Sequence, residues 1–191
     1  MGITYVETRH IATSTFPEKE LKGRARREII SKLANFLARA KKKEKFVGYT
    51  LRDMHGMLLM KRLEPEIFES LTRGFGEVGE RLSKVIEYHP HLIEVTDEFS
   101  KVFGLSHPWF EYFVYDPEDN KFKVKITGYD TSVCEERAPK GLKGRELRKF
   151  IEECLEEGMR PFIKKHLDDV ADVNCEYRPR RGFECWLEFN I

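Results

Sequence analysis

The chain has 191 residues, of which 40% are hydrophobic and 35% charged, and its formal net charge is only +1. This length and apolar content suffice for one domain with its own core, so a disordered chain and a disulfide-dependent miniprotein are both excluded. No apolar run approaches the roughly 18 residues of a membrane-spanning helix, and the start lacks a signal peptide's basic and apolar regions, so we expect a single cytoplasmic domain over residues 1–191 with no membrane partner.

The charged residues are unevenly distributed. Residues 18–46 hold 11 Lys or Arg but only 4 Asp or Glu, so a basic segment lies in an otherwise acidic chain. The chain contains no Gln and only four Asn. Abundant Lys and Glu with few thermolabile amides is typical of hyperthermophile proteins, and we therefore expect a thermophilic source.

Residues 1–45 predict a strand followed by a basic amphipathic helix. Residues 3–11 form the strand, and Thr15 with Glu18 then makes a capping-box pattern. Apolar residues follow at steps of three and four along one helical face, ending at Ala40. The basic residues fall mostly on the other faces.

Residues 46–63 admit two interpretations. Two short apolar runs flank residues 53–56, which favours a hairpin. A Met-rich helix is the alternative, but Gly48 and Gly56 disfavour it because glycine costs a helix about 1 kcal/mol relative to alanine. The sequence therefore favours the hairpin.

Pro65 begins a second long helix, whose apolar residues keep helical phase throughout. The glycines within it, at positions 74, 76 and 79, would let another backbone approach closely. Pro90 is expected to end this helix. A short helix near 96–103 then follows, with Thr96 as its N-cap.

A symmetric hairpin is predicted over residues 109–129, with a turn at 116–120. Pairing partners would have numbers that sum to 236, which places Tyr112 opposite Val124 on an apolar face. The other face would carry Lys residues beside aromatic ones. A slip of one residue would mix the two faces, so their segregation supports this register.

A third helix begins near Gly144, Gly158 and Pro161 are expected to kink or break it, and a last helical piece reaches about residue 170. A closing hairpin then pairs residues 173–177 with 183–191, in a register whose numbers sum to 360. The expected fold class is therefore α+β, an antiparallel sheet built from hairpins with helices packed mainly on one face.

The closing hairpin would place Cys175 directly opposite Cys185. These two could form a disulfide, or could bind a metal ion such as zinc together with Cys134. A third interpretation is that they are small buried apolar residues, as free cysteines commonly are. No C-x-x-C motif is present to decide the matter, and no other cofactor is predicted.

Other motifs favour structural roles. His89 and His91 flank a proline and are expected at a helix terminus or in a loop, while the remaining histidines have no spacing that identifies partners. A G-x-G-x-x-G pattern at 74–79 lies within a helix and does not follow a strand, so it predicts no nucleotide site. No nucleophile elbow or zinc-protease motif occurs, and we expect no catalysis.

From Met57 to Ile191, roughly 70% of the chain, the element order resembles 4-vinyl reductase-type small-molecule-binding domains, relatives of haem–nitric-oxide-binding domains. The shared features are a Gly-containing helix followed by Glu80-Arg-Leu, a hairpin, a helix, and a closing strand pair with Cys175, Gly182 and Cys185. The spacing of these cysteines is longer than the family's usual one, and the basic N-terminal helix has no counterpart. The resemblance implies a pocket for a small ligand and no built-in catalysis. A Tyr-x-Ser-x-Arg signature is absent, so haem is not expected.

Two binding functions follow from these features. The first is a sensor or binding domain with a pocket for a small, largely apolar ligand, lined by Phe75, Tyr112, Val124 and Phe150. The alternative is a nucleic-acid- or ribosome-associated protein. Its contacts would be Arg24, Arg26, Arg27, Lys41, Lys42, Lys43, Lys121 and Lys123. Either function is compatible with a homodimer.

Overall fold

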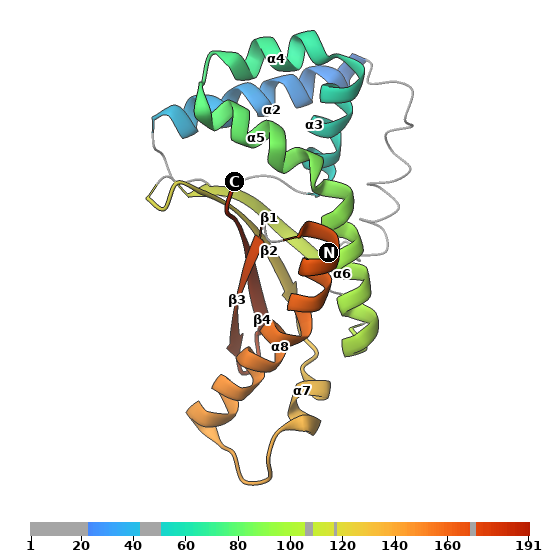
Figure 1. The fold of residues 1–191 in the computed structure, drawn as a ribbon, viewed down its shortest axis with the longest axis vertical. Coiled ribbons are helices and arrows are strands. Elements are labelled where there is room, and N and C mark those ends of the chain that lie inside the picture. Colours follow the sequence, from blue (N-terminus) through green and yellow to red (C-terminus); the bar gives the residue numbers. More distant parts are fainter. Residues whose placement is uncertain (1–22, 43–50, 106–108, 117, 169–170) are drawn as a thin grey trace. The chain divides into compact units, whose positions relative to one another are not determined.

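The computed structural model of the chain describes residues 23–42, 51–105, 109–116, 118–168 and 171–191. These ranges contain seven α-helices and four β-strands, drawn in Figure 1. They form two compact units. The first holds the described residues up to His89 together with 112–123 and Ile191, and the second holds 90–111 and 124–190. The predicted strand at 3–11 lies outside the described residues.

The first unit contains four helices: α2 (Gly23–Lys41), α3 (Leu51–Leu63), α4 (Pro65–Arg73) and α5 (Glu77–Glu87). The apolar face predicted for α2 is confirmed, because Ile29, Leu33, Phe36, Leu37 and Ala40 are all buried. Phe36 also stacks on Phe122, with 6.2 Å between ring centroids. The amphipathic pattern therefore places α2 against the core of this unit.

The hairpin predicted within residues 46–63 is wrong, because α3 occupies most of that range. Gly56 lies inside α3, where it allows close packing against α2, and it forms no turn. A Cβ atom at this position would lie 2.5 Å from Cδ1 of Ile29 on α2. The apolar run 57–60 is buried on every side, so it shows no periodicity that separates a helix from a strand.

The long helix predicted from Pro65 is two helices, since a turn at 74–76 separates α4 from α5. Gly76 provides the break, with φ of +55° at the N-cap of α5. The predicted close backbone approach is present at Gly79, where a Cβ atom would lie 2.2 Å from the carbonyl oxygen of Thr72.

Pro90 does not end a helix but lies in the first turn of α6 (His89–Phe103). Proline is tolerated there because the first N–H groups of a helix have no intrahelical partner. Thr96 is consequently no N-cap. Its buried hydroxyl donates a hydrogen bond to the carbonyl oxygen of Leu92 inside the helix.

The sheet has the strands β1 (Trp109–Asp116), β2 (Lys121–Gly128), β3 (Ala171–Arg178) and β4 (Gly182–Phe189), in the order β1-β2-β4-β3. The two predicted hairpins are thus joined along β2 and β4, and the α+β antiparallel class is confirmed. The register of β3 and β4 is the predicted one, from Ala171 opposite Phe189 to Arg178 opposite Gly182.

Burial alternates along β2 as predicted. Phe122, Val124 and Ile126 are buried, and the lysines between them are half-buried. The side chains of residues 109–114 are not described, so the pairing of Tyr112 with Val124 stays a prediction. Of the three interpretations of the closing cysteines, the structure has the disulfide between Cys175 and Cys185.

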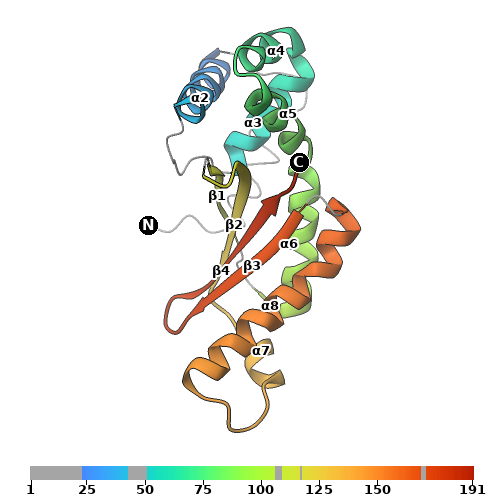
Figure 2. The same ribbon diagram turned by 60° about the vertical axis from the view of Figure 1, so that its left-hand side comes forward.

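The second unit is completed by α7 (Ser132–Arg137) and α8 (Gly144–Leu167), and α8 packs on β3. Figure 2 shows α6 and α8 on the same face of the sheet. The predicted break near Gly158 is wrong, because α8 is continuous through both Gly158 and Pro161, and the alternative of a kink there stays a prediction. Pro161 is exposed, so water can bond the carbonyl group that proline leaves without a partner.

Gly158 allows Phe103 of α6 to lie against α8. A Cβ atom at Gly158 would be 2.1 Å from Cζ of Phe103, which is 2% exposed. We expect Gly158→Ala to lower the free energy of unfolding by about 2 kcal/mol through overpacking, although alanine normally favours a helix. Urea unfolding checks this.

The control for this substitution is Gly74→Ala. Gly74 has φ of −67° and no neighbouring atom within 4 Å of its ideal Cβ. We expect no loss of stability there. A Gly158→Ala protein more stable than wild type would contradict the close contact of Phe103 on α6 with Gly158 on α8.

Candidate metal centre

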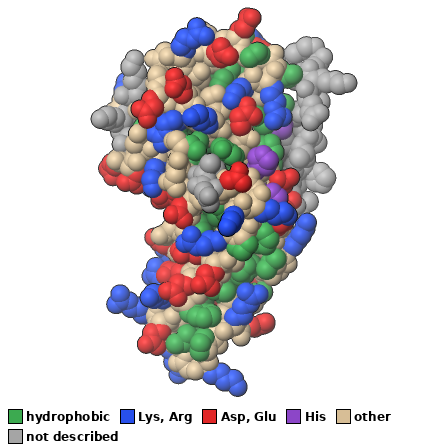
Figure 3. Space-filling view, in the orientation of Figure 1, with side chains coloured by type: hydrophobic (Ala, Val, Ile, Leu, Met, Phe, Trp, Pro, Cys, Tyr) green, Lys and Arg blue, Asp and Glu red, His purple; other side chains and the backbone are tan. Residues whose placement is uncertain are grey.

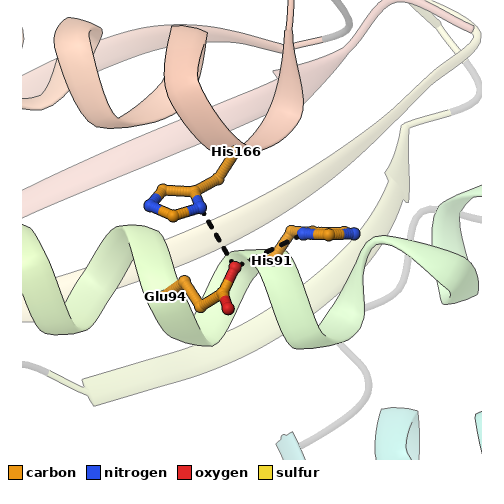
Figure 4. Close-up of side chains that lie close together, drawn as sticks. All are labelled: His91, Glu94 and His166. Carbon is orange, nitrogen blue, oxygen red and sulfur yellow. Dashed lines mark ion pairs between the residues drawn. The ribbon is translucent and has the colours of Figure 1, made fainter.

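Two histidines and a glutamate from α6 and α8 converge in the second unit (Figure 4). His91, Glu94 and Glu98 recur at steps of three and four along α6, so they share one helical face. An adjacent face of α6 is apolar and buried. His166 lies in the last turn of α8, between the buried residues Ile163 and Leu167, and its ring points toward Glu94.

The ligand atoms are already close together. Nδ1 of His166 lies 3.0 Å and Nδ1 of His91 lies 3.4 Å from the same Oε2 atom of Glu94. One ligand atom from each residue can be chosen so that all three lie within 4.8 Å of one another. Zinc binds such atoms at about 2.0–2.2 Å, which separates neighbouring ligands by roughly 3.0–3.5 Å. The two contacts to Glu94 fall in this range, and a small side-chain rotation would bring in the third.

A second carboxylate, that of Glu98, contacts the other ring nitrogen of His166. Nε2 of His166 lies 3.0 Å from Oε1 of Glu98. A carboxylate only accepts, so each ring nitrogen of His166 that carries a proton donates to the carboxylate it faces, Nε2 to Glu98 and Nδ1 to Glu94. A ligating histidine that donates its other N–H to a carboxylate is the common arrangement around metal ions in proteins.

Lys165 fixes Glu98 in turn, with its Nζ 2.7 Å from the same Oε1 atom. Hydrogen bonds from Lys165 and His166 hold the pKa of Glu98 below its usual value. Glu98 is therefore charged when His166 is oriented. Without a metal ion, the same geometry gives salt bridges whenever the histidines are protonated, since both carboxylates accept from His166.

The sequence did not predict this centre. His91 was expected to have a helix-terminus role, and it does lie in the first turn of α6, but His166 is 75 residues away and only the tertiary fold makes them neighbours. The detectable signal was His91-x-x-Glu94, which places two ligands on one helical face. The other metal candidate, Cys134 with Cys175 and Cys185, is not assembled, because the last two form the disulfide.

A buried histidine pair lies in the first unit. The rings of His55 on α3 and His89 have centroids 5.5 Å apart. His89 is 1% exposed, and neither of its ring nitrogens has a hydrogen-bond partner among the described residues. Burial, with smaller contributions from the charges of His55 and Arg62, lowers the pKa of His89 to about 3. His89 is consequently neutral at physiological pH.

The four predicted pocket residues have different surroundings. Phe150 lines a surface pocket of about 400 Å³ in the second unit, together with Arg137, Cys154 and two glutamates. Val124 is buried in the sheet, and Phe75 is half-buried between α4 and α5. The side chain of Tyr112 is not described. An apolar ligand pocket formed by these residues therefore stays a prediction.

The residues predicted to contact nucleic acid differ in their exposure and in their ion pairing. Arg24, Arg27 and Lys42 are exposed. Arg26 instead pairs with Glu64 at 2.7 Å, and Lys123 pairs with two aspartates. Lys121 is half-buried, whereas the side chain of Lys41 and all of Lys43 lie outside the described residues. On the face in Figure 3, the described Lys and Arg side chains are interspersed with Asp and Glu and form no single basic patch.

Comparisons of the chain with protein-family models, curated proteins and solved structures gave no match. The resemblance to 4-vinyl reductase-type domains therefore stays a prediction. Within the described residues, no helix combines the length and the apolar character needed to cross a membrane.

Proposed function

We propose that this protein binds a divalent transition-metal ion, most favourably Zn²⁺, through His91, Glu94 and His166. The observation that supports the proposal is the convergence of three ligand atoms within 4.8 Å, with Glu98 behind one of the histidines.

The donor set favours zinc over the other common divalent ions. Two imidazole nitrogens and one carboxylate oxygen match the preference of Zn²⁺, whereas Ca²⁺ and Mg²⁺ require oxygen ligands. Three protein ligands leave a fourth position for water or for a small molecule. His91 and Glu94 are exposed, so this position is open to solvent.

Metal binding would also connect α6 to α8. An ion bound only by the folded state stabilises that state by about 2.7 kcal/mol when its free concentration is 100 times its dissociation constant. The proposed function therefore includes a stabilising effect on the second unit. A small ligand at the open position would combine this proposal with the binding function predicted from sequence.

Isothermal titration of the metal-free protein with zinc tests the proposal. We expect one ion per chain, and we expect His166→Ala and Glu94→Gln to weaken binding at least 100-fold. Glu98→Gln should weaken it 10- to 100-fold, because it removes only the outer carboxylate. The matched control is Glu153→Gln, which removes a carboxylate from an exposed position on α8 and should bind as wild type does. Equal affinity in Glu94→Gln and Glu153→Gln would refute the site.

A further inference from the structure

The strand β3 lies at an edge of the sheet. It is the last strand in the order β1-β2-β4-β3, so among the described strands it has a neighbour on one side only. The Cα atoms of Cys175 and Cys185 are 4.0 Å apart, the short spacing of a non-hydrogen-bonded antiparallel pair. The backbone N–H and C=O groups of Cys175, and of Val173 and Tyr177 two residues to either side, therefore point away from β4.

Two glutamates of α8 cap this outward edge. The N–H of Cys175 donates to Oε1 of Glu156 at 2.8 Å, and the N–H of Tyr177 donates to Oε1 of Glu152 at 2.9 Å. Residues four apart on a helix are separated by about 6 Å, and residues two apart on a strand by about 6.8 Å. Because these spacings match, both carboxylates reach their donors while α8 packs on β3.

The positions on either side of these two donors are also closed to pairing. The N–H of Val173 donates to Oδ1 of Asp172 at 3.1 Å, and Pro179 has no N–H group. Charged side chains and proline are common means by which edge strands are kept from pairing with another chain. Each outward donor between residues 173 and 179 is therefore either occupied or missing.

The capped edge is complementary to a second copy of itself. Two outward edges can pair only in registers whose residue numbers have an even sum. The longest overlaps within β3 have the sum 350, which aligns residues 172–178, or 348, which aligns 171–177. The first places Asp172 opposite Arg178 of the second copy, whereas the second places Asp172 opposite Glu176. Opposite charges stabilise a cross-strand pair and like charges destabilise it, so the sum 350 is favoured.

Asp172 and Arg178 are available for pairing between chains. Both are exposed, and within the chain they contact Arg160 and Glu176 at 3.2 and 3.0 Å. Exposed ion pairs contribute little to stability, so exchanging these pairs for pairs between two chains costs little.

We propose that β3 is a homodimerisation edge and that Glu152 and Glu156 keep the chain monomeric by capping it. A second β3 strand has to displace both carboxylates before it can form its own hydrogen bonds. Once they are displaced, two β3 strands pair about a twofold axis at Cys175, and the two sheets become one. An ion pair between Asp172 and Arg178 then lies on either side of the axis.

Sedimentation velocity tests the proposal, in the presence of a chelator so that no metal ion joins two chains. We expect wild type to be monomeric. The double variant Glu152→Ala, Glu156→Ala should self-associate about 100-fold more tightly and form dimers, because two charge-assisted hydrogen bonds no longer oppose pairing. The matched control is Glu152→Gln with Glu156→Gln, which keeps an acceptor oxygen at each N–H and should stay monomeric.

Charge reversal tests the register of the dimer. Adding Arg178→Asp to the alanine variant places two acidic side chains opposite each other, and we expect it to weaken the dimer about 10-fold. Adding Asp172→Arg as well should restore the dimer, which non-specific association would not do.

Circular dichroism verifies that each variant is folded. If the double alanine variant is not, Glu152→Ala alone takes its place and should self-associate about 10-fold more tightly than wild type. A folded alanine variant as monomeric as wild type, a wild type that dimerises as tightly as the alanine variant, or a dimer unaffected by Arg178→Asp would overturn the proposal.

Discussion

Acidifying the metal-free protein from pH 7 to pH 4 is expected to lower its free energy of unfolding by about 3 kcal/mol through His89 alone. The pKa of His89 is about 3 in the folded state, compared with about 6.5 for an unperturbed histidine. Between these values the unfolded chain binds a proton that the folded chain does not. The contribution of His89 is therefore fully present above pH 6.5 and is lost as pH falls toward 3.

The expected loss of stability at acid pH comes from the surroundings of His89. Its ring is buried, and the groups that oppose its protonation are His55 and Arg62, both on α3. His89→Leu removes the titrating group together with its two buried ring nitrogens, which make no hydrogen bond to the described residues, so it should cost little at pH 7. Its unfolding free energy should consequently depend less on pH than that of wild type, by roughly 1.4 kcal/mol per pH unit.

Urea unfolding between pH 4 and pH 7, in the presence of a chelator, measures this difference. The matched control is His91→Gln, which removes an exposed histidine two residues along α6 and should keep the acid sensitivity of wild type. The same pH dependence in His89→Leu and in wild type would mean that other groups cause the acid sensitivity.

Arg81→Leu is expected to destabilise the protein by about 3 kcal/mol. The side chain of Arg81, on α5, is only 9% exposed. Its Nε donates to the carbonyl oxygen of Ile191 at 2.6 Å, and its Nη atoms donate to Oδ1 and to the carbonyl oxygen of Asn120. Removing the guanidinium loses three charge-assisted hydrogen bonds at once; Asn120 is exposed and Ile191 half-buried, so water replaces only part of what is lost.

The turn at Asn120 depends on the same arginine. Asn120 has φ of +51°, and Tyr115 also donates its hydroxyl to Oδ1 of Asn120, at 2.7 Å. The guanidinium lies 5.5 Å from the ring centroid of Phe122, where it adds a cation–π contact. Arg81 therefore connects α5 to the hairpin turn and to Ile191, all within the first unit.

Two further variants separate charge from geometry. Arg81→Lys keeps the charge but cannot form the planar set of hydrogen bonds, so we expect it to recover less than half of the loss. Arg73→Leu removes an exposed arginine of α4 that pairs with the exposed Glu69, and should change stability by less than about 0.5 kcal/mol. Chemical denaturation of Arg81→Leu, Arg81→Lys and Arg73→Leu measures these differences in stability. Wild-type stability in Arg81→Lys would contradict the hydrogen-bonding role of Arg81.

The sequence predicts those parts of the fold in which one face is buried and the other is solvated. The apolar stripe of α2, the alternation along β2 and the register that pairs Cys175 with Cys185 all carry such a pattern, and the structure has each of them. Prediction from the sequence fails where burial is uniform, as in α3. It also fails where proline lies in the first turn of a helix, as at Pro90, or where glycine serves close packing, as at Gly158.

The candidate metal centre could not be predicted for a different reason. Its ligands come from two helices whose contact depends on how both pack on the sheet, and no local pattern encodes that contact. One of these ligands, His166, has no distinguishing neighbours in the sequence.

Crystals grown with zinc and measured at the zinc absorption edge test the central claim most directly. We expect one anomalous peak about 2.0–2.2 Å from a ring nitrogen of His91, a ring nitrogen of His166 and a carboxylate oxygen of Glu94. The absence of a peak there at saturating zinc, or a single peak at other residues, would contradict metal binding by these three side chains.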